Sequence, residues 1–212
     1  MEELNLIQKI AIYALPVLLA ITLHEAAHAY AAKRFGDATA YMMGRMTLNP
    51  LKHIDPVGTV LLPLLSLVIG GFLFGWAKPV PVNFGALRNP RVGMRWVAAA
   101  GPAANLVMAI MWVLLLKLAI VMDNDYSRPL ALMSQAGIVI NVVLMVLNLM
   151  PILPLDGGRI VESLLPRPLA YRFSRLEPYG MWILLALVFT GLLSPILRPF
   201  TTMVYELLGF LL

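Results

Sequence analysis

Four stretches of this sequence, each about as long as a membrane-spanning helix, contain no charged residue. They are Val57–Ala77, Trp96–Leu116, Pro129–Leu155 and Pro178–Leu197. A helix needs about 20 predominantly apolar residues to cross a bilayer. Only 13% of the 212 residues are charged and 60% are hydrophobic, against about 25% and about 45–50% in soluble domains. The excess apolar surface must face lipid, so the sequence predicts an all-α polytopic membrane protein.

A fifth apolar stretch, Ile10–Ala32, carries a cluster of ionisable side chains: His24, Glu25 and His28. An ionisable residue within a membrane span costs roughly 2.5–3.5 kcal/mol, so three together require a compensating interaction. Two His at positions i and i+4 share one helical face and can chelate a zinc ion, while a Glu between them can act as general base. The alternative is a buried polar cluster that bridges helices.

A zinc ion that also holds a water takes three protein ligands, and Asp156 is the leading candidate for the third. It follows the longest uncharged stretch, after Pro151 and Pro154, which interrupt a helix, and before two glycines that permit close approach of the chain. From the residues alone, capping of a following amphipathic helix (157–165) explains Asp156 equally well. The other acidic or imidazole side chains considered are His53, Asp55, Glu162 and Glu206.

Three elements of the sequence form a combined pattern: His24-Glu25-x-x-His28, Gly101-Pro102-x-x-Asn105, and Asn148-x-x-Pro151-x-x-Pro154-Leu155-Asp156-Gly157-Gly158. Together they resemble the site-2 protease family of intramembrane metalloproteases, peptidase family M50. The resemblance implies a three-helix catalytic core, one zinc ion per chain held by His24, His28 and Asp156, and Glu25 as the general base. It also implies that the substrates are membrane-spanning proteins, cleaved within or near their transmembrane segments in regulated intramembrane proteolysis.

The segment Asn49-Pro50-x-x-His53-x-Asp55-Pro56-x-Gly58 resembles a compact subgroup of that family without PDZ or CBS domains. We therefore expect a single membrane-embedded domain, 1–212, in a prokaryotic cell (inner) membrane. We interpret His53 as a loop residue that hydrogen-bonds near Asp55; the alternative is that it assists the site transiently. Asn105 and Asn148 are candidates for binding the extended substrate backbone or the developing oxyanion, and hydrogen bonding between helices is the alternative for both.

Lys and Arg gather in three segments, 33–55, 78–95 and 156–177, whereas 1–9 and 117–128 contain few. The positive-inside rule places the three rich segments in the cytoplasm. Two of them flank Val57–Ala77, so we expect this stretch to be re-entrant; the alternative is an ordinary span that breaks the rule. His24 would then lie about 14 Å from the cytoplasmic end of its helix, inside the membrane.

Two connecting segments, Ala38–Leu48 and Pro79–Leu87, have the composition of short membrane-associated strands. Such strands could hold an unwound substrate by β-addition. We expect no nucleic-acid partner, because basic residues are not interleaved with aromatic ones in a stripe. Two rival functions stay open: a membrane transition-metal transporter, and a catalytically inactive binding scaffold.

Overall fold

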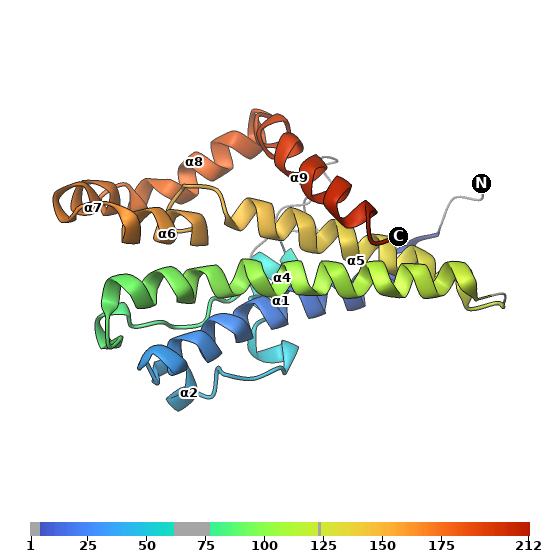
Figure 1. Cartoon of the computed structure of the whole chain (residues 1–212), viewed down its shortest axis with the longest axis horizontal. Coiled ribbons are helices and arrows are strands. Elements are labelled where there is room, and N and C mark those ends of the chain that lie inside the picture. Colours follow the sequence, from blue (N-terminus) through green and yellow to red (C-terminus); the bar gives the residue numbers. More distant parts are fainter. Residues whose placement is uncertain (1–4, 62–76, 123) are drawn as a thin grey trace.

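The computed structural model describes residues 5–61, 77–122 and 124–212, and within these ranges every regular element is helical. Figure 1 shows three long helices, α1, α4 and α5, lying side by side, with shorter helices along them. In chain order the elements are α1 (Leu6–Phe35), α2 (Thr39–Met42), η1 (Pro50–Lys52), η2 (Pro56–Leu61), η3 (Phe84–Ala86), α4 (Pro90–Val121), α5 (Ser127–Asn148), α6 (Asp156–Leu164), α7 (Arg167–Ser174), α8 (Glu177–Phe189) and α9 (Leu193–Gly209).

The three long helices confirm the prediction of an all-helical membrane protein. Ile7–Phe35, Pro90–Val121 and Ser127–Asn148 are each long and apolar enough to cross a bilayer. Local signals set their ends. Asn5 and Gln8 form a capping box at the start of α1, and Asn89 caps α4, which begins at a proline.

Two of the predicted spans are interrupted. The stretch Pro129–Leu155 is helical only to Asn148, and residues 149–155 form an irregular connection to α6. Prolines at 151 and 154 lack the N–H that would continue the helix. The stretch Pro178–Leu197 is divided between α8 and α9, which are bent by 89°. Gly191, with φ of 73°, provides the left-handed residue at that bend.

The prediction of short strands is wrong. Neither Ala38–Leu48 nor Pro79–Leu87, both within the described ranges, contains a strand; the first holds α2 and the second holds η3. A strand needs a partner edge, but the backbone amides of Val80 and Asn83 instead donate to side chains of Glu25 and Asp37. In Pro79–Leu87 the backbone is extended at Asn83 and Leu87, but the predicted strand pairing is wrong for both segments.

Most of the predicted re-entrant stretch Val57–Ala77, namely 62–76, lies outside the described residues. Its flanks do lie together, because Lys78 N donates to His53 O at 2.9 Å. The basic segments also share one end of the bundle: Arg88 N donates to Phe35 O at 2.9 Å, and the Arg91 guanidinium donates to Leu165 O. The re-entrant path stays a prediction, which these contacts favour.

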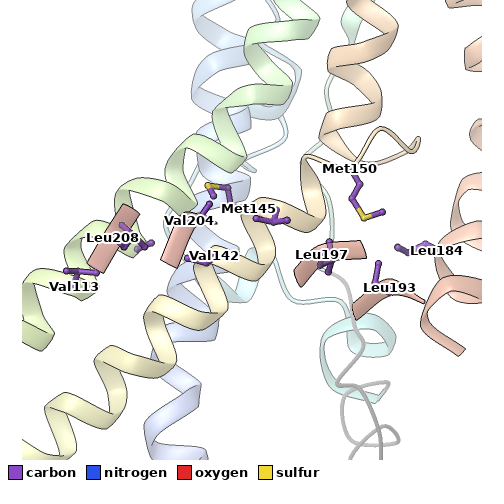
Figure 2. Packing of buried hydrophobic residues seen from close by; sticks show 11 residues of the cluster. Val113, Val142, Met145, Met150, Leu184, Leu193, Leu197, Val204 and Leu208 are labelled. Atoms are coloured by element: carbon purple, nitrogen blue, oxygen red, sulfur yellow. The ribbon is translucent and has the colours of Figure 1, made fainter. Parts of the chain in front are cut away.

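The principal apolar core lies between α4, α5, α8 and α9 (Figure 2). Val142 and Val113 are almost completely buried there, and Leu197 and Val204 of α9 pack against the same cluster. Helices α4 and α5 approach closely because Gly137 faces Trp112: a Cβ on Gly137 would lie 2.3 Å from the indole. This packing fixes α4, which in turn carries part of the site described next.

Candidate metal centre

The two histidines of α1 lie one turn apart and point their Nε2 atoms toward the same place. His24 and His28 are 8% and 9% exposed, and their Nε2 atoms are 3.0 Å apart. This follows from the spacing i, i+4 in a helix of 3.6 residues per turn. The predicted helical chelating pair is therefore assembled within α1 itself.

Asp156, at the first position of α6, reaches both histidines. Its Oδ2 lies 3.3 Å from His24 Nε2 and its Oδ1 lies 3.3 Å from His28 Nε2. The capping alternative finds no support, because α6 has Leu155 at its N-cap and no side-chain cap. The irregular chain before α6 turns the carboxylate toward α1, which brings together residues 128 positions or more apart in sequence.

The group fits a zinc ion. The ligand atoms of His24, His28 and Asp156 all lie within 4.8 Å of one another. Nitrogen and oxygen ligands bound at about 2.0–2.1 Å in a tetrahedron lie about 3.3–3.4 Å apart, close to the distances here. Asp156 Oδ2 is buried and, within the described chain, accepts no hydrogen bond. That is the state expected of an oxygen whose partner is a cation.

A second layer of hydrogen bonds orients the imidazoles. His24 Nδ1 lies 2.6 Å from Asn105 Oδ1, and His28 Nδ1 lies 2.7 Å from Val97 O. Each acceptor favours the tautomer with the proton on Nδ1, which leaves the Nε2 lone pair for a metal. Asn105 Nδ2 in turn donates to Asn141 Oδ1 at 3.0 Å. These hydrogen bonds, from His24 to Asn105 and from Asn105 to Asn141, link α1 to α4 and α5.

Glycine makes room for this arrangement. A Cβ on Gly101 would lie 2.4 Å from His28 Nε2 and 2.6 Å from His24 Nε2. The Gly101-Pro102-x-x-Asn105 element therefore has two roles: Gly101 leaves space for the imidazoles, and Asn105 hydrogen-bonds to His24. One turn of α4 offers an open face at Gly101, and the next presents the Asn105 amide to the same pair of imidazoles.

The other predicted site residues have different surroundings. Glu25 is partly exposed, and its Oε2 accepts a hydrogen bond from Val80 N at 2.7 Å. Asn105 is 0% exposed, so its amide serves His24 and Asn141 rather than an open surface. Asn148 Nδ2 donates to Leu144 O of its own helix at 2.9 Å. The structure places Asn105 in hydrogen-bond distance of His24, one of the candidate metal ligands, and among the described residues Asn148 makes no hydrogen bond to the three candidate ligands.

The four rival ligand candidates lie outside the His24–His28–Asp156 group. His53 donates from Nε2 to Thr47 O at 2.9 Å, as a buried loop residue does. Asp55 accepts from Val57 N and Gly58 N, and Glu162 pairs with Arg159. Glu206 lies on the exposed face of α9.

Sequence reasoning did not single out Asn141, Val97 or Val80. Asn141 had a usable signal, because a polar amide within an uncharged membrane stretch usually hydrogen-bonds across helices. Val97 and Val80 act through backbone atoms, so their side-chain identity carried no signal of this role.

The comparisons with known proteins agree with this geometry. The model of the family described as "Peptidase family M50" matches residues 119–190. A Bacillus subtilis (strain 168) protein, YwhC, named as a candidate zinc metalloprotease, is 42% identical over 187 residues, 86% of this chain and 82% of YwhC. Rip2 of Mycolicibacterium smegmatis, named in the same way, is 34% identical over 198 residues, 91% of this chain and 71% of Rip2. No solved structure is significantly similar to the chain.

The two relatives cover 86% and 91% of the chain at 42% and 34% identity, which decides its family, and both are named as zinc metalloproteases. The three long apolar helices indicate that the protein is embedded in a membrane. The chain belongs to peptidase family M50 and is an integral membrane, zinc-dependent peptidase of the site-2 type.

Proposed function

We propose that this chain carries out regulated intramembrane proteolysis, with one zinc ion held by His24, His28 and Asp156 and with Glu25 as the general base. One observation carries the proposal. The three ligand groups converge on α1, a helix long and apolar enough to span a membrane, at a place away from its ends. A peptidase site at that depth acts on chains that are themselves in the membrane.

The residues divide the chemistry among themselves. When bound, zinc supplies a Lewis acid that polarises the scissile carbonyl and makes water a better nucleophile near neutral pH. Asn105 and Val97 keep the imidazole lone pairs directed inward. Glu25 takes a proton from the attacking water and delivers it to the leaving amine. Its Oε1 is suited to this task because, within the described chain, only Oε2 makes a hydrogen bond.

The charge pattern supports a site nearer the cytoplasm of a prokaryotic cell. Helix α1 carries Lys33 and Arg34 in its last turn, and the other basic segments gather at the same end of the bundle through Arg88 and Arg91. By the positive-inside rule that end is cytoplasmic. His24 lies nine residues before Lys33, so the metal centre is about 14 Å below this end.

Cysteine labelling tests this orientation, because the chain has no cysteine of its own. Single cysteines would replace Met43, Arg88, Asp125 and Arg167, all exposed. We expect a membrane-impermeant thiol reagent, added to intact cells, to label position 125 only. Labelling of position 88 but not 43 would contradict both the orientation and the re-entrant path of 57–77.

The function itself is tested by co-expressing the enzyme with tagged single-span membrane proteins. We expect wild-type enzyme to cut some of them within or near the span, and Glu25→Gln to cut none while keeping about one zinc per chain by elemental analysis. Glu206→Gln, the same change on the exposed face of α9, is the matched control and should cleave normally. Undiminished cleavage by purified Glu25→Gln would refute the assignment of the base.

A metal transporter would place several ligand groups along a path. The described residues contain one group of three or more His and acidic side chains with metal-binding geometry. This observation, together with the family, favours the peptidase.

A further inference from the structure

The segment 78–88, here called the strap, lies along the C-terminal half of α1 without forming a strand. At its start, Lys78 N donates to His53 O, and at its end Arg88 N donates to Phe35 O, both at 2.9 Å. The strap is therefore fixed at both ends to the region around α1. Between these ends it touches the one residue to which we assign proton transfer.

That contact is the hydrogen bond from Val80 N to Glu25 Oε2, 2.7 Å long. A hydrogen bond to a charged acceptor is stronger than one between neutral groups. It holds one carboxylate oxygen and leaves the other without a hydrogen-bond partner in the described part of the chain. The Val80 side chain is only 8% exposed and packs with Ala29 and Ala40. This packing fixes the height of the amide along α1.

Two charged side chains hold the strap from outside α1. Asp37 is 1% exposed and accepts from Asn83 N through Oδ2 at 2.7 Å, while its Oδ1 accepts from Thr39 N at 2.9 Å. Arg45 donates to Lys78 O at 3.0 Å and to Pro79 O at 3.3 Å. The strap is thus held before Val80 by Arg45 and after Val80 by Asp37.

The sequence of the strap suits a rigid support. Pro79 and Pro81 flank Val80, and each has a fixed φ and no N–H. Within residues 79–82, the backbone N–H donors are therefore those of Val80 and Val82 alone. Val80 N binds Glu25, whereas Val82 N has no hydrogen-bond partner among the described residues. The two valines offer matched positions with opposite roles.

We propose that the strap is the positioning element of the general base: Val80 N–H orients the Glu25 carboxylate, and Asp37 holds the strap in the place that makes this contact. The inference rests on the proposed role of Glu25. It assigns to Val80 and Asp37 an effect on the rate of the chemical step, and none on metal binding or substrate binding.

The decisive experiment replaces one backbone N–H by oxygen, using 2-hydroxyisovaleric acid in place of Val80 or of Val82. The side chain is kept, and both residues follow a proline. The full-length enzyme would be purified, its zinc measured, and kcat and KM determined on a cleavable membrane substrate. We expect the ester at 80 to lower kcat about tenfold or more, with KM and zinc unchanged, and the ester at 82 to leave kcat at the wild-type value.

Equal kcat for the two esters would overturn the proposal, and so would a rise in KM with unchanged kcat at position 80, which would indicate substrate binding instead. Val80→Ala, which keeps the N–H, must lose less kcat than the ester at 80. If the enzyme with the ester at position 80 loses zinc, the Asp37→Asn variant provides the test instead. A lowered kcat at full zinc content in Asp37→Asn supports the positioning role of the strap, and an unchanged kcat refutes it. Glu25→Gln in the same assay separates the two claims, because full activity there refutes the base itself.

Discussion

The candidate metal centre and the C-terminal helix pair α8–α9 differ in how their polar side chains are placed. At the candidate metal centre, His24, Asn105 and Asn141 are buried and joined by hydrogen bonds. On α9, Arg198 and Glu206 are exposed, and only one face, with Leu197 and Val204, packs on the core.

The difference shows where this protein tolerates change. A buried polar network loses function when any member is displaced, because its groups have no water to replace a lost partner. An exposed helical face has no such constraint. Substitutions of the same kind should therefore have large effects around His24 and small ones on α9, and four experiments test this contrast.

The largest effect should come from a single methyl group at position 101. Gly101→Ala places a Cβ 2.4 Å from His28 Nε2, so the imidazoles must move. We expect loss of zinc and a fall in cleavage of about a hundredfold or more. Gly209→Ala on α9 is the matched control, since apart from its own helix backbone no atom of the described residues lies within 4 Å of the added Cβ. Elemental analysis measures the zinc content of both variants, and a cleavage assay measures their activity. Full zinc content in Gly101→Ala would contradict the predicted difference between the two regions.

A smaller effect is expected from Asn105→Ala. It removes the acceptor 2.6 Å from His24 Nδ1 and a donor to Asn141. Loss of such an outer partner typically weakens metal binding about 10–100-fold, which competition with a zinc chelator would measure. Asn124→Ala, an exposed asparagine in the turn before α5, should leave zinc affinity unchanged. Equal affinities for the two variants would show that the tautomer of His24 is set elsewhere.

The Asp37 carboxyl, outside the spans, should give a pH-dependent effect on stability. Burial raises the pKa of Asp37, but hydrogen bonds from Thr39 and from Asn83 N outweigh it, and the pKa lies below its ordinary value. A depressed pKa stabilises the fold above the unfolded value of about 4 and loses this contribution as pH falls through the folded value.

We therefore expect Asp37→Asn to lower Tm in detergent at pH 7, and the difference from wild type to shrink below about pH 4. Asp125→Asn, an exposed acid, provides the matched control. A Tm difference that is the same at pH 7 and at pH 3.5 would mean that Asp37 acts by packing and not by charge.

The smallest effect is expected on α9. Arg198→Gln removes a charge that is exposed on this helix, and we expect a change in unfolding free energy within about 0.5 kcal/mol, with zinc content and cleavage unchanged. Chemical denaturation in detergent measures the first. A large loss of unfolding free energy would contradict the predicted contrast between the two regions. It would show that the polar face of α9 has a partner in the assembled enzyme.

The sequence predicted the arrangement of the two histidines better than the contacts that hold the candidate site in place. The i, i+4 spacing of His24 and His28 is a local property of one helix, so it was readable without tertiary structure. From the residues alone Asp156 can be either a metal ligand or a helix cap, because its partners lie 128 and 132 positions away; the family resemblance favours the ligand. The extended composition around Val80 was recognised, but its contact with Glu25, 55 residues away, was not.

By itself, the sequence determined the membrane-spanning helices and the placement of His24 and His28 on one helical face. Apolar length, capping and helical periodicity act within a few residues of the chain, so they can be read without the tertiary structure. What only the tertiary structure decided is how α4, α5 and α6 meet α1: the amide of Asn105 on His24, the carboxylate of Asp156 between two imidazoles, and the strap on Glu25. These contacts depend on close packing between distant segments, where glycines such as Gly101 set the approach, and no local pattern encodes that distance.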